Sequence, residues 1–332
     1  MRFLATREQR DFARSLDAML TAARTPTAIR AWAAGDPSPG RALWSRLAEV
    51  GVFALAVPEP YEGMGPLPVE LATAFVELGR HGMPGPVVET VAASALLAEL
   101  ARRGEDGPAK RLLPGIAMGG TIATLPPAVG GPGYALDADV ADLVLAVRGD
   151  ELWLAPGHEG VRASADPARR LALPAPGGEL LAAGPAVTAA VAQAGGWAVL
   201  ATAAQSLGVG LTLLDRTVAY AKERRQFGTE IGSFQAVKHR LADTLIALEF
   251  ARPLLFGAAL TFESADLAAA KVTAGEAACT AARTALQIHG AIGYTEELDL
   301  SLWLRKARPL RDAWGTPSWC RARVLDAYDG GS

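Results

Sequence analysis

The sequence predicts an α+β fold that is mostly α-helical, and three observations support this prediction. Apolar residues recur at helical spacing in the first 113 residues. Gly, Pro and short β-like runs are frequent between residues 114 and 185, and long helical patterns return from residue 186. We therefore expect an N-terminal helical domain (1–113), a small middle β-domain (114–185) and a C-terminal helical bundle (186–332).

The N-terminal domain opens with a sequence typical of a helix start. Thr6 followed by Gln9 fits a capping box, and Phe12, Leu16 and Met19 share one helix face. Further helices are predicted at 39–50, 69–78 and 87–102.

Local patterns also predict the elements of the other two domains. In the middle domain, strands are predicted at 121–125, 142–147, 151–155 and 170–173. In the bundle, helices are predicted at 187–224, 233–263, 265–289 and 297–308. Ser233 is the expected N-cap of the second of these helices.

Composition restricts the class of protein. The chain has 332 residues, half of them hydrophobic, which is enough for about two domains and a large core. A net charge of -3 gives no reason to expect a nucleic-acid partner. Cys279 and Cys320 cannot form a disulfide framework, and residues 1–7 have no apolar signal segment. We therefore expect a cytoplasmic protein.

One uncharged stretch, from Leu180 to Leu214, is longer than the ~20 residues that a membrane span needs. It is rich in Ala and Gly and is interrupted by Pro185, Gln193 and Gln205. Small residues suit close helix packing in a soluble bundle better than contact with lipid. We predict a buried helix and no membrane span.

The first chemical motif is Glu223-Arg224-Arg225-Gln226-Phe227-Gly228, followed by Gly232-Ser233-Phe234-Gln235. A guanidinium such as that of Arg224 can fork onto phosphate oxygens, and such a bond is worth roughly 1.5–3 kcal/mol. Gln235 lies in the first turn of the next helix, where backbone N–H groups favour an anion. The alternative is that Arg224 and Arg225 only cap a helix C-terminus.

The second motif is Gln287-Ile288-His289-Gly290-Ala291-Ile292-Gly293-Tyr294. Gly290 and Gly293 would let a ligand approach the backbone closely, and Gln287 can pair with donors and acceptors of a nucleotide. The alternative is a helix that ends on Gly290 and continues into a turn.

In this order and at this separation, the two motifs resemble the FAD-binding signatures of acyl-CoA dehydrogenases. The resemblance covers about 190 to 328, and the helical region 1–113 is compatible with it. It implies that family's fold, in which a C-terminal four-helix bundle mediates dimerisation. It also implies FAD as the cofactor, an acyl-CoA substrate and an acceptor like electron-transfer flavoprotein.

Family members use the matching residues across the dimer interface, on the FAD whose flavin ring sits in the neighbouring subunit. The resemblance assigns this role to Arg224, Gln226, Phe227, Gln235, Gln287, Gly290, Ala291 and Gly293. Ala291 replaces a glycine of the usual pair but keeps its backbone N–H.

The chain departs from the family at the catalytic base. The family's glutamate lies in a Tyr-Glu-Gly-Thr stretch, which here reads Ala313-Trp314-Gly315-Thr316. A positioned base contributes roughly 10²–10⁴-fold to proton abstraction, and an indole cannot accept the proton. Some family members carry the glutamate at the position of Ala198. Asp312 is a weak candidate for a displaced base, so no catalytic residue is assigned.

Other expected groups are also altered. The family's flavin-cradling Thr-Glu-Pro segment corresponds here to Ala-Thr-Leu-Pro-Pro-Ala at 123–128. Trp153 is expected to be a packed strand residue. The histidines, which show no metal-ligand spacing with Cys or paired carboxylates, are His81, His158, His239 and His289.

The leading interpretation is a non-catalytic subunit of a heteromeric acyl-CoA dehydrogenase. It resembles the short subunit of actinobacterial enzymes that desaturate CoA thioesters of steroid side chains. A full-length acyl-CoA dehydrogenase subunit would be the partner, in a heterodimer or an α2β2 heterotetramer, and would supply the base. Two alternatives are a homodimeric flavoenzyme with a displaced base and a non-catalytic acyl-CoA-binding or scaffold protein.

Overall fold

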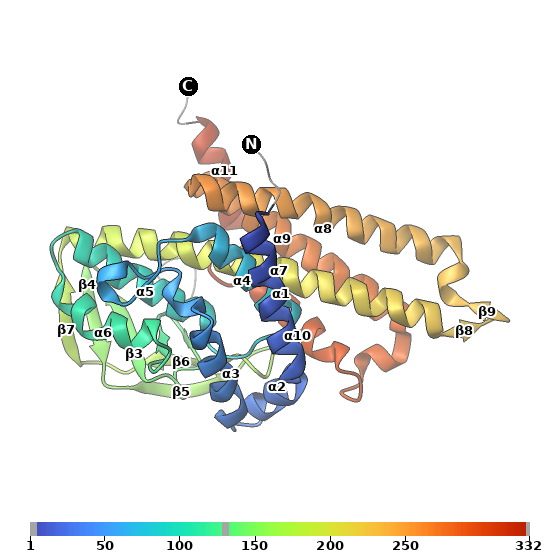
Figure 1. Cartoon of the computed structure of the whole chain (residues 1–332), viewed down its shortest axis with the longest axis horizontal. Helices are drawn as coiled ribbons and strands as arrows, with labels where there is room; N and C mark the ends of the chain where they lie inside the picture. Colours follow the sequence, from blue (N-terminus) through green and yellow to red (C-terminus); the bar gives the residue numbers. More distant parts are fainter. Residues whose placement is uncertain (1–4, 128–132, 330–332) are drawn as a thin grey trace.

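The computed structural model describes residues 5–127 and 133–329 (Figure 1). The chain forms helices, then two small sheets, then long helices, which is the α+β, mostly helical order predicted from the sequence. The N-terminal helices are α1 (Arg7–Ala22), α2 (Thr25–Ala33), α3 (Ser38–Glu49), α4 (Pro68–Arg80), α5 (Val87–Arg102) and α6 (Gly107–Ala117). The C-terminal helices are α7 (Pro185–Glu223), α8 (Gln235–Thr261), α9 (Ser264–His289), α10 (Leu300–Asp312) and α11 (Pro317–Asp329).

The predicted capping box at the start of α1 is confirmed. Thr6 Oγ1 accepts a hydrogen bond from the Gln9 backbone at 3.2 Å, and Gln9 Oε1 accepts one from the Thr6 backbone at 2.9 Å. Helices α2, α6 and α11 were not among the predicted elements. Helix α2 has only nine residues and α6 contains Pro114, so their local signals are weak and packing must stabilise them.

Among the described residues of the middle region, seven strands form two sheets. They are β1 (Ala123–Thr124), β2 (Ala135–Leu136), β3 (Leu143–Arg148), β4 (Glu151–Ala155), β5 (His158–Ala163), β6 (Arg170–Pro174) and β7 (Glu179–Ala183). One sheet has the order β1-β3-β4-β7, in which β1 is parallel to β3 and the other pairs are antiparallel. The other is antiparallel with the order β2-β6-β5. The predictions missed β2, β5 and β7, and the six residues of β5 are all exposed and lack an apolar alternation.

Helix α7 is the central element of the fold. Its 39 residues span about 58 Å and run from the sheets to the far end of the molecule (Figure 1). It crosses α4 at backbone contact: a Cβ on Gly208 would lie 2.0 Å from Val76 O, and one on Gly79 would lie 2.2 Å from Gln205 O. Glycine is therefore required on both sides of this crossing.

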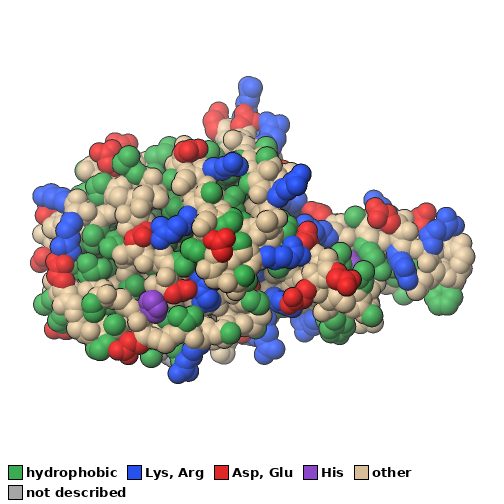
Figure 2. Space-filling view, turned by 90° about the horizontal axis from the view of Figure 1, so that it is seen from below, with side chains coloured by type: hydrophobic (Ala, Val, Ile, Leu, Met, Phe, Trp, Pro, Cys, Tyr) green, Lys and Arg blue, Asp and Glu red, His purple; other side chains and the backbone are tan. Residues whose placement is uncertain are grey.

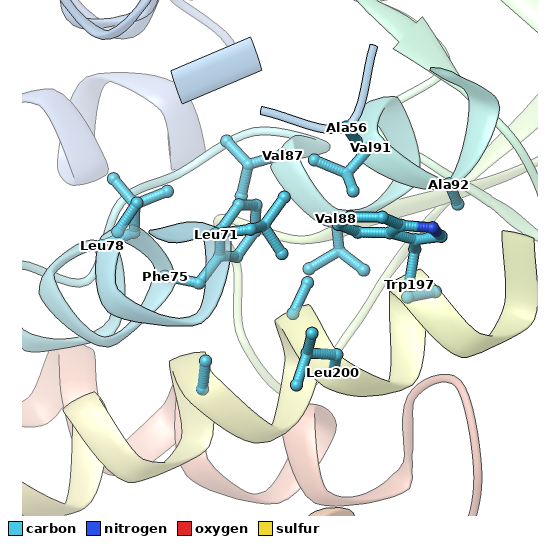
Figure 3. Close-up of a cluster of buried hydrophobic side chains, with 14 of the residues drawn as sticks. Ala56, Leu71, Phe75, Leu78, Val87, Val88, Val91, Ala92, Trp197 and Leu200 are labelled. Carbon is cyan, nitrogen blue, oxygen red and sulfur yellow. The ribbon is translucent and has the colours of Figure 1, made fainter. Parts of the chain in front are cut away.

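The core is continuous between the N-terminal helices and α7. Leu71 and Phe75 of α4 and Val88 of α5 face Trp197 and Leu200 of α7 (Figure 3). All five side chains are buried. Burial of apolar side chains of this size contributes roughly 1.5–3 kcal/mol each, so this contact joins the two helical regions into one packed unit.

Within the described residues, two helices, α7 and α8, are long and apolar enough to cross a membrane by length and composition. The most apolar window of α7 is 94% buried inside the protein, as expected for the predicted core helix. The corresponding window of α8 is only 33% buried, so α8 presents apolar side chains at the surface.

The prediction of Ser233 as the N-cap of α8 was wrong. Ser233 closes a 3-10 turn, and its Oγ donates to Glu230 O at 2.7 Å. The N-cap of α8 is Phe234, which provides no side-chain hydrogen bond. The extra turn after Gly232 shifts the helix start by two residues.

Candidate functional site

The first motif forms a hairpin at the end of the bundle. Strands β8 (Arg225–Gln226) and β9 (Thr229–Glu230) pair there, joined by Phe227 and Gly228 with φ of +52° and +82°. Phe227 is 91% exposed and meets Phe234 edge-on, with ring centroids 6.3 Å apart. The bundle ends in a narrow projection at this side of the molecule (Figures 1 and 2).

Arg224 is the C-cap residue of α7, directly before the hairpin. Its side chain is exposed, and its guanidinium makes no hydrogen bond or ion pair with the part of the chain that the structure describes. Gln235 begins α8, whose N-terminus has no side-chain cap. A free guanidinium beside an uncapped helix N-terminus fits a phosphate group.

The second motif lies beside the first. Helix α9 ends at His289, Gly290 follows with φ of +65°, and residues Gly290–Tyr294 form a 3-10 turn. The ring of Tyr220, one turn before Arg224, stacks on His289 with centroids 4.2 Å apart. This stack brings the ends of α7 and α9 together. Burial lowers the pKa of His289, which favours a neutral imidazole in the stack.

Most of the predicted FAD-binding residues are accessible. The exposed ones are Arg224, Gln226, Phe227, Gln235, Gln287, Gly290 and Ala291. A Cβ on Gly290 would meet nothing within 4 Å, so a ligand could approach there. Gly293 is buried, and a Cβ there would lie 3.2 Å from Leu286 Cδ1, which indicates a packing role. The accessible set offers a cation, amides and open backbone, which suits a dinucleotide.

A cavity of about 880 Å³ lies at the other end of α7. Its walls come from α5, the segment after β1, the first turns of α7, the α8–α9 corner, the 313–316 loop and α11. Leu125, Pro126 and Pro127 of the altered flavin-cradling segment line it, while Ala128 lies outside the described residues. Arg102, Arg103 and Arg323 add positive charge.

Trp314 lines this cavity and is 8% exposed. It adopts a left-handed backbone with φ of +56°, and its Nε1 donates to Glu89 Oε1 at 3.0 Å. Burial raises the pKa of Glu89, and the nearby Arg169 charge and the Trp314 N–H oppose this shift. The position at which the family resemblance expects a base therefore holds a hydrogen-bond donor.

Lys271 fixes the loop that carries Trp314. Its buried ammonium donates to the carbonyl oxygens of Leu310, Arg311 and Gly315 at 3.0, 2.7 and 3.4 Å. A lysine that satisfies the last carbonyls of a helix holds the following chain in place.

Two carboxylates near the cavity, Glu99 and Asp312, are poorly suited to act as a base. Glu99 lines the cavity, but Arg102 and Arg103 bind it at 2.6 and 2.7 Å and lower its pKa. Asp312 ends α10, is held by Arg311 at 2.8 Å and does not line the cavity. Ala198 is fully buried in α7.

Sequence reasoning missed both Glu89 and Glu99. An acid inside the apolar run 87–98 could have marked Glu89 as buried, and arginines three and four positions after Glu99 could have marked its ion pairs. Trp153, expected in a packed strand, does lie in β4. Its indole donates to Glu151 at 3.0 Å, under Arg148.

The fold and the paired motifs define a flavin-dependent acyl-CoA dehydrogenase. Residues 6–120 match the acyl-CoA dehydrogenase N-terminal domain and residues 191–327 match the C-terminal domain. The chain belongs to the acyl-CoA dehydrogenase family, whose members are FAD-dependent oxidoreductases that act on CH–CH bonds of acyl-CoA thioesters.

Individual relatives are similar over nearly the whole chain. Acyl-CoA dehydrogenase IpdE2 of Mycobacterium tuberculosis is 36% identical over 90% of this chain and 91% of its own length. One chain in the structure of the Tcur3481-Tcur3483 steroid ACAD G363A variant is 25% identical to this chain. The match covers 98% of this chain and 98% of that chain, with a TM-score of 0.83. One chain of the ChsE4-ChsE5 complex from Mycobacterium tuberculosis is also 25% identical. That match covers 99% of this chain and 99% of that chain, with a TM-score of 0.79.

Proposed function

We propose that this chain is a subunit of a heteromeric, FAD-dependent acyl-CoA dehydrogenase that completes the FAD site of its partner and does not supply the catalytic base. One observation carries the proposal. Val199 lines the cavity, and Arg224 lies 25 residues further along the same helix, roughly 38 Å away. One FAD would have to bridge this distance to join the hairpin to the Trp314 cavity of its own chain, so the separation supports a hairpin that serves another subunit.

The outer face of α8 is the proposed contact with that subunit. Exposed apolar side chains recur along it at helical spacing: Leu245, Ile246, Phe250 and Leu254. A contiguous apolar stripe at the surface of a soluble protein marks an interaction site. The stripe begins less than three turns after the start of α8, so a partner on α8 also reaches the hairpin residues.

The partner is a full-length acyl-CoA dehydrogenase subunit rather than a second copy of this chain. A second copy would bring another Trp314, whose indole N–H cannot accept the α-proton of an acyl-CoA. When bound, FAD supplies the hydride acceptor for the β-carbon. This chain contributes Arg224 to the diphosphate and Gln235 and Gln287 to the nucleotide, while the partner contributes the base.

Two similar solved structures support a heteromeric assembly and a steroid side-chain substrate. The Tcur3481-Tcur3483 steroid ACAD and the ChsE4-ChsE5 complex each combine two different proteins. By analogy, the substrate here is an acyl-CoA thioester of a steroid side chain, and the electrons pass to an acceptor like electron-transfer flavoprotein. A cytoplasmic location belongs to the same proposal.

The proposal is tested by co-expressing the chain with candidate full-length subunits. The intact mass of the complex and the amount of released FAD are then measured. We expect one FAD for each pair of unlike chains, and acyl-CoA oxidation only by the complex. Two FAD per pair, or a stable homodimer that carries two, would contradict it.

A further inference from the structure

A second pocket, of about 260 Å³, lies where α1, α2 and α4 meet α7 and α10. We propose that it binds the phosphate group of a small ligand, independently of the FAD site. The residues that line it are Asp17, Leu20, Thr21, Arg24, Thr25, Pro26, Arg80, His81, Thr212, Arg216 and Trp303. Three arginines and three threonines therefore line this pocket, so most of its polar side chains can donate hydrogen bonds.

Arg216 is the main argument for an anion. It is half-buried, and its guanidinium carbon lies 4.3 Å from the centre of the Trp303 ring. No acceptor among the described residues takes a hydrogen bond from this guanidinium. The nearby Asp299 is engaged by Arg30 at 2.7 Å. A partly desolvated cation with free N–H groups in a pocket is stabilised by a bound anion.

The start of α2 is a second, independent argument. Arg24, Thr25 and Pro26 line the pocket and form the N-terminus of this nine-residue helix. The helix has no side-chain cap and no acidic residue in its first turn. Pro26 has no N–H, and the N–H groups of Arg24 and Thr27 donate to Thr21 O and Arg24 O, so this end offers an anion the Thr25 N–H and the helix dipole.

The acidic groups nearby do not cancel the positive charge. Asp17, which contacts His81 Nε2 at 2.8 Å, is one negative charge against the two arginines that are unpaired among the described residues, Arg24 and Arg216, and burial raises the pKa of Glu77 to about 7. Asp17, Glu77 and His81 could offer ligand atoms to a metal, but Arg80 lies 3.7 Å from Glu77 and opposes a cation. Arg80 is also bound by Asp215 at 3.0 Å, so Arg24 and Arg216 provide the free charge.

The volume restricts the ligand. Cavities that enclose drug-sized molecules start near about 300 Å³, so this pocket is too small for FAD or a whole CoA thioester. It suits inorganic phosphate or a short phosphate monoester. The floor is rigid, because Trp303 Nε1 donates to Arg80 O at 2.9 Å and Thr212 Oγ1 donates to the same oxygen at 2.8 Å.

Calorimetric titration of the purified full-length chain tests the proposal, with inorganic phosphate and glycerol 3-phosphate as probes at constant ionic strength in chloride. We expect one site per chain. Arg216→Gln should weaken binding about tenfold or more, because it removes a charge-assisted fork. Arg24→Gln changes an exposed side chain and should weaken it several-fold, even if Arg216→Gln fails to fold.

Arg7→Gln is the matched control, since it removes an exposed arginine at the opposite end of α1. Its binding should equal that of the wild type. Tighter binding of the ester than of phosphate would support a metabolite ligand, and equal binding would support free phosphate. The proposal would be overturned if no saturable binding were found. It would also be overturned if the Arg24→Gln and Arg216→Gln variants bound phosphate as tightly as the wild type. Because binding is measured without FAD or a partner, failure here leaves the proposed function untouched.

Discussion

Trp314 Nε1 donates a hydrogen bond to Glu89 Oε1 at 3.0 Å, between residues 225 positions apart in the sequence. The bond joins the loop after α10 to α5 in the N-terminal region. Glu89 Oε2 is buried and has no partner among the described residues, so the carboxyl depends on the indole N–H. Trp314, at the position where the family resemblance expects a glutamate, is thus fixed to the N-terminal helices.

Trp314→Phe should destabilise the protein by about 1–3 kcal/mol, because it leaves a buried carboxyl without its donor. The midpoint of denaturant unfolding measures this loss. Trp319→Phe is the control, since the Trp319 indole N–H makes no hydrogen bond with the described residues although its ring also lines the cavity. Equal losses in the two variants would mean that ring volume, not the Glu89 bond, matters.

Lys271→Met should loosen the loop that carries Trp314. The variant keeps an unbranched side chain, one atom shorter, but leaves the carbonyls of Leu310, Arg311 and Gly315 without the ammonium. Hydrogen exchange of amides in residues 311–316 should accelerate about tenfold or more, which corresponds to one lost hydrogen bond of ordinary strength. Lys110→Met, at an exposed ion pair, should leave that exchange unchanged.

Periodic and capping signals predicted much of the fold because they are local. The capping box at Thr6 and Gln9 and the helix 87–102 required only neighbouring residues. The β5 strand could not be predicted from its sequence, because its residues do not alternate between apolar and polar. The strand forms through backbone hydrogen bonds to β6, which local sequence does not specify.

In the candidate site, too, local features could be predicted and contacts between distant elements could not. The two motifs predicted to bind FAD are each contiguous in the chain, so their residues could be named from the sequence alone. The partnership of Trp314 with Glu89 depends on the packing of distant elements, as does the stack of Tyr220 on His289. The pocket around Arg216 draws on five helices, which no local pattern reveals.

Asp137→Asn should flatten the dependence of stability on pH. Burial raises the pKa of Asp137 to about 7, from an ordinary value of 3.8. The folded state therefore binds the proton more tightly, and the free energy of unfolding falls as pH rises from about 4 to about 7. The shift corresponds to at most about 4 kcal/mol.

Asparagine can keep the hydrogen bond that Asp137 accepts from the Arg170 backbone at 2.9 Å, and it tolerates the φ of +49°. Urea unfolding at several pH values measures the slope. Part of the slope should persist, because the pKa of Glu77 is also raised to about 7. Asp150→Asn, at an exposed position, should retain the full wild-type slope.

Phe250→Glu should prevent assembly with the full-length partner. The side chain is 69% exposed in the middle of the apolar stripe on α8, so a carboxylate there would be buried unpaired at the interface. Stability of the isolated chain should change by less than about 0.5 kcal/mol, as for most surface substitutions. Co-purification and the mass of the complex measure assembly. Met118→Glu, at the exposed C-cap of α6, should assemble normally, and normal assembly of Phe250→Glu would remove α8 from the interface.

Arg224→Ala should strip FAD from the assembled complex while the bundle remains folded. The guanidinium is exposed and makes no bond with the described residues, so its loss costs the fold little. Loss of a charge-assisted contact to the diphosphate should weaken FAD binding about tenfold or more. Flavin absorbance of the purified complex measures occupancy, and circular dichroism checks the helices. Arg225→Ala is the neighbouring control, because Arg225 donates within the hairpin to Gly228 O at 3.4 Å. If Arg224→Ala keeps wild-type occupancy, Arg224 acts only as the C-cap residue of α7.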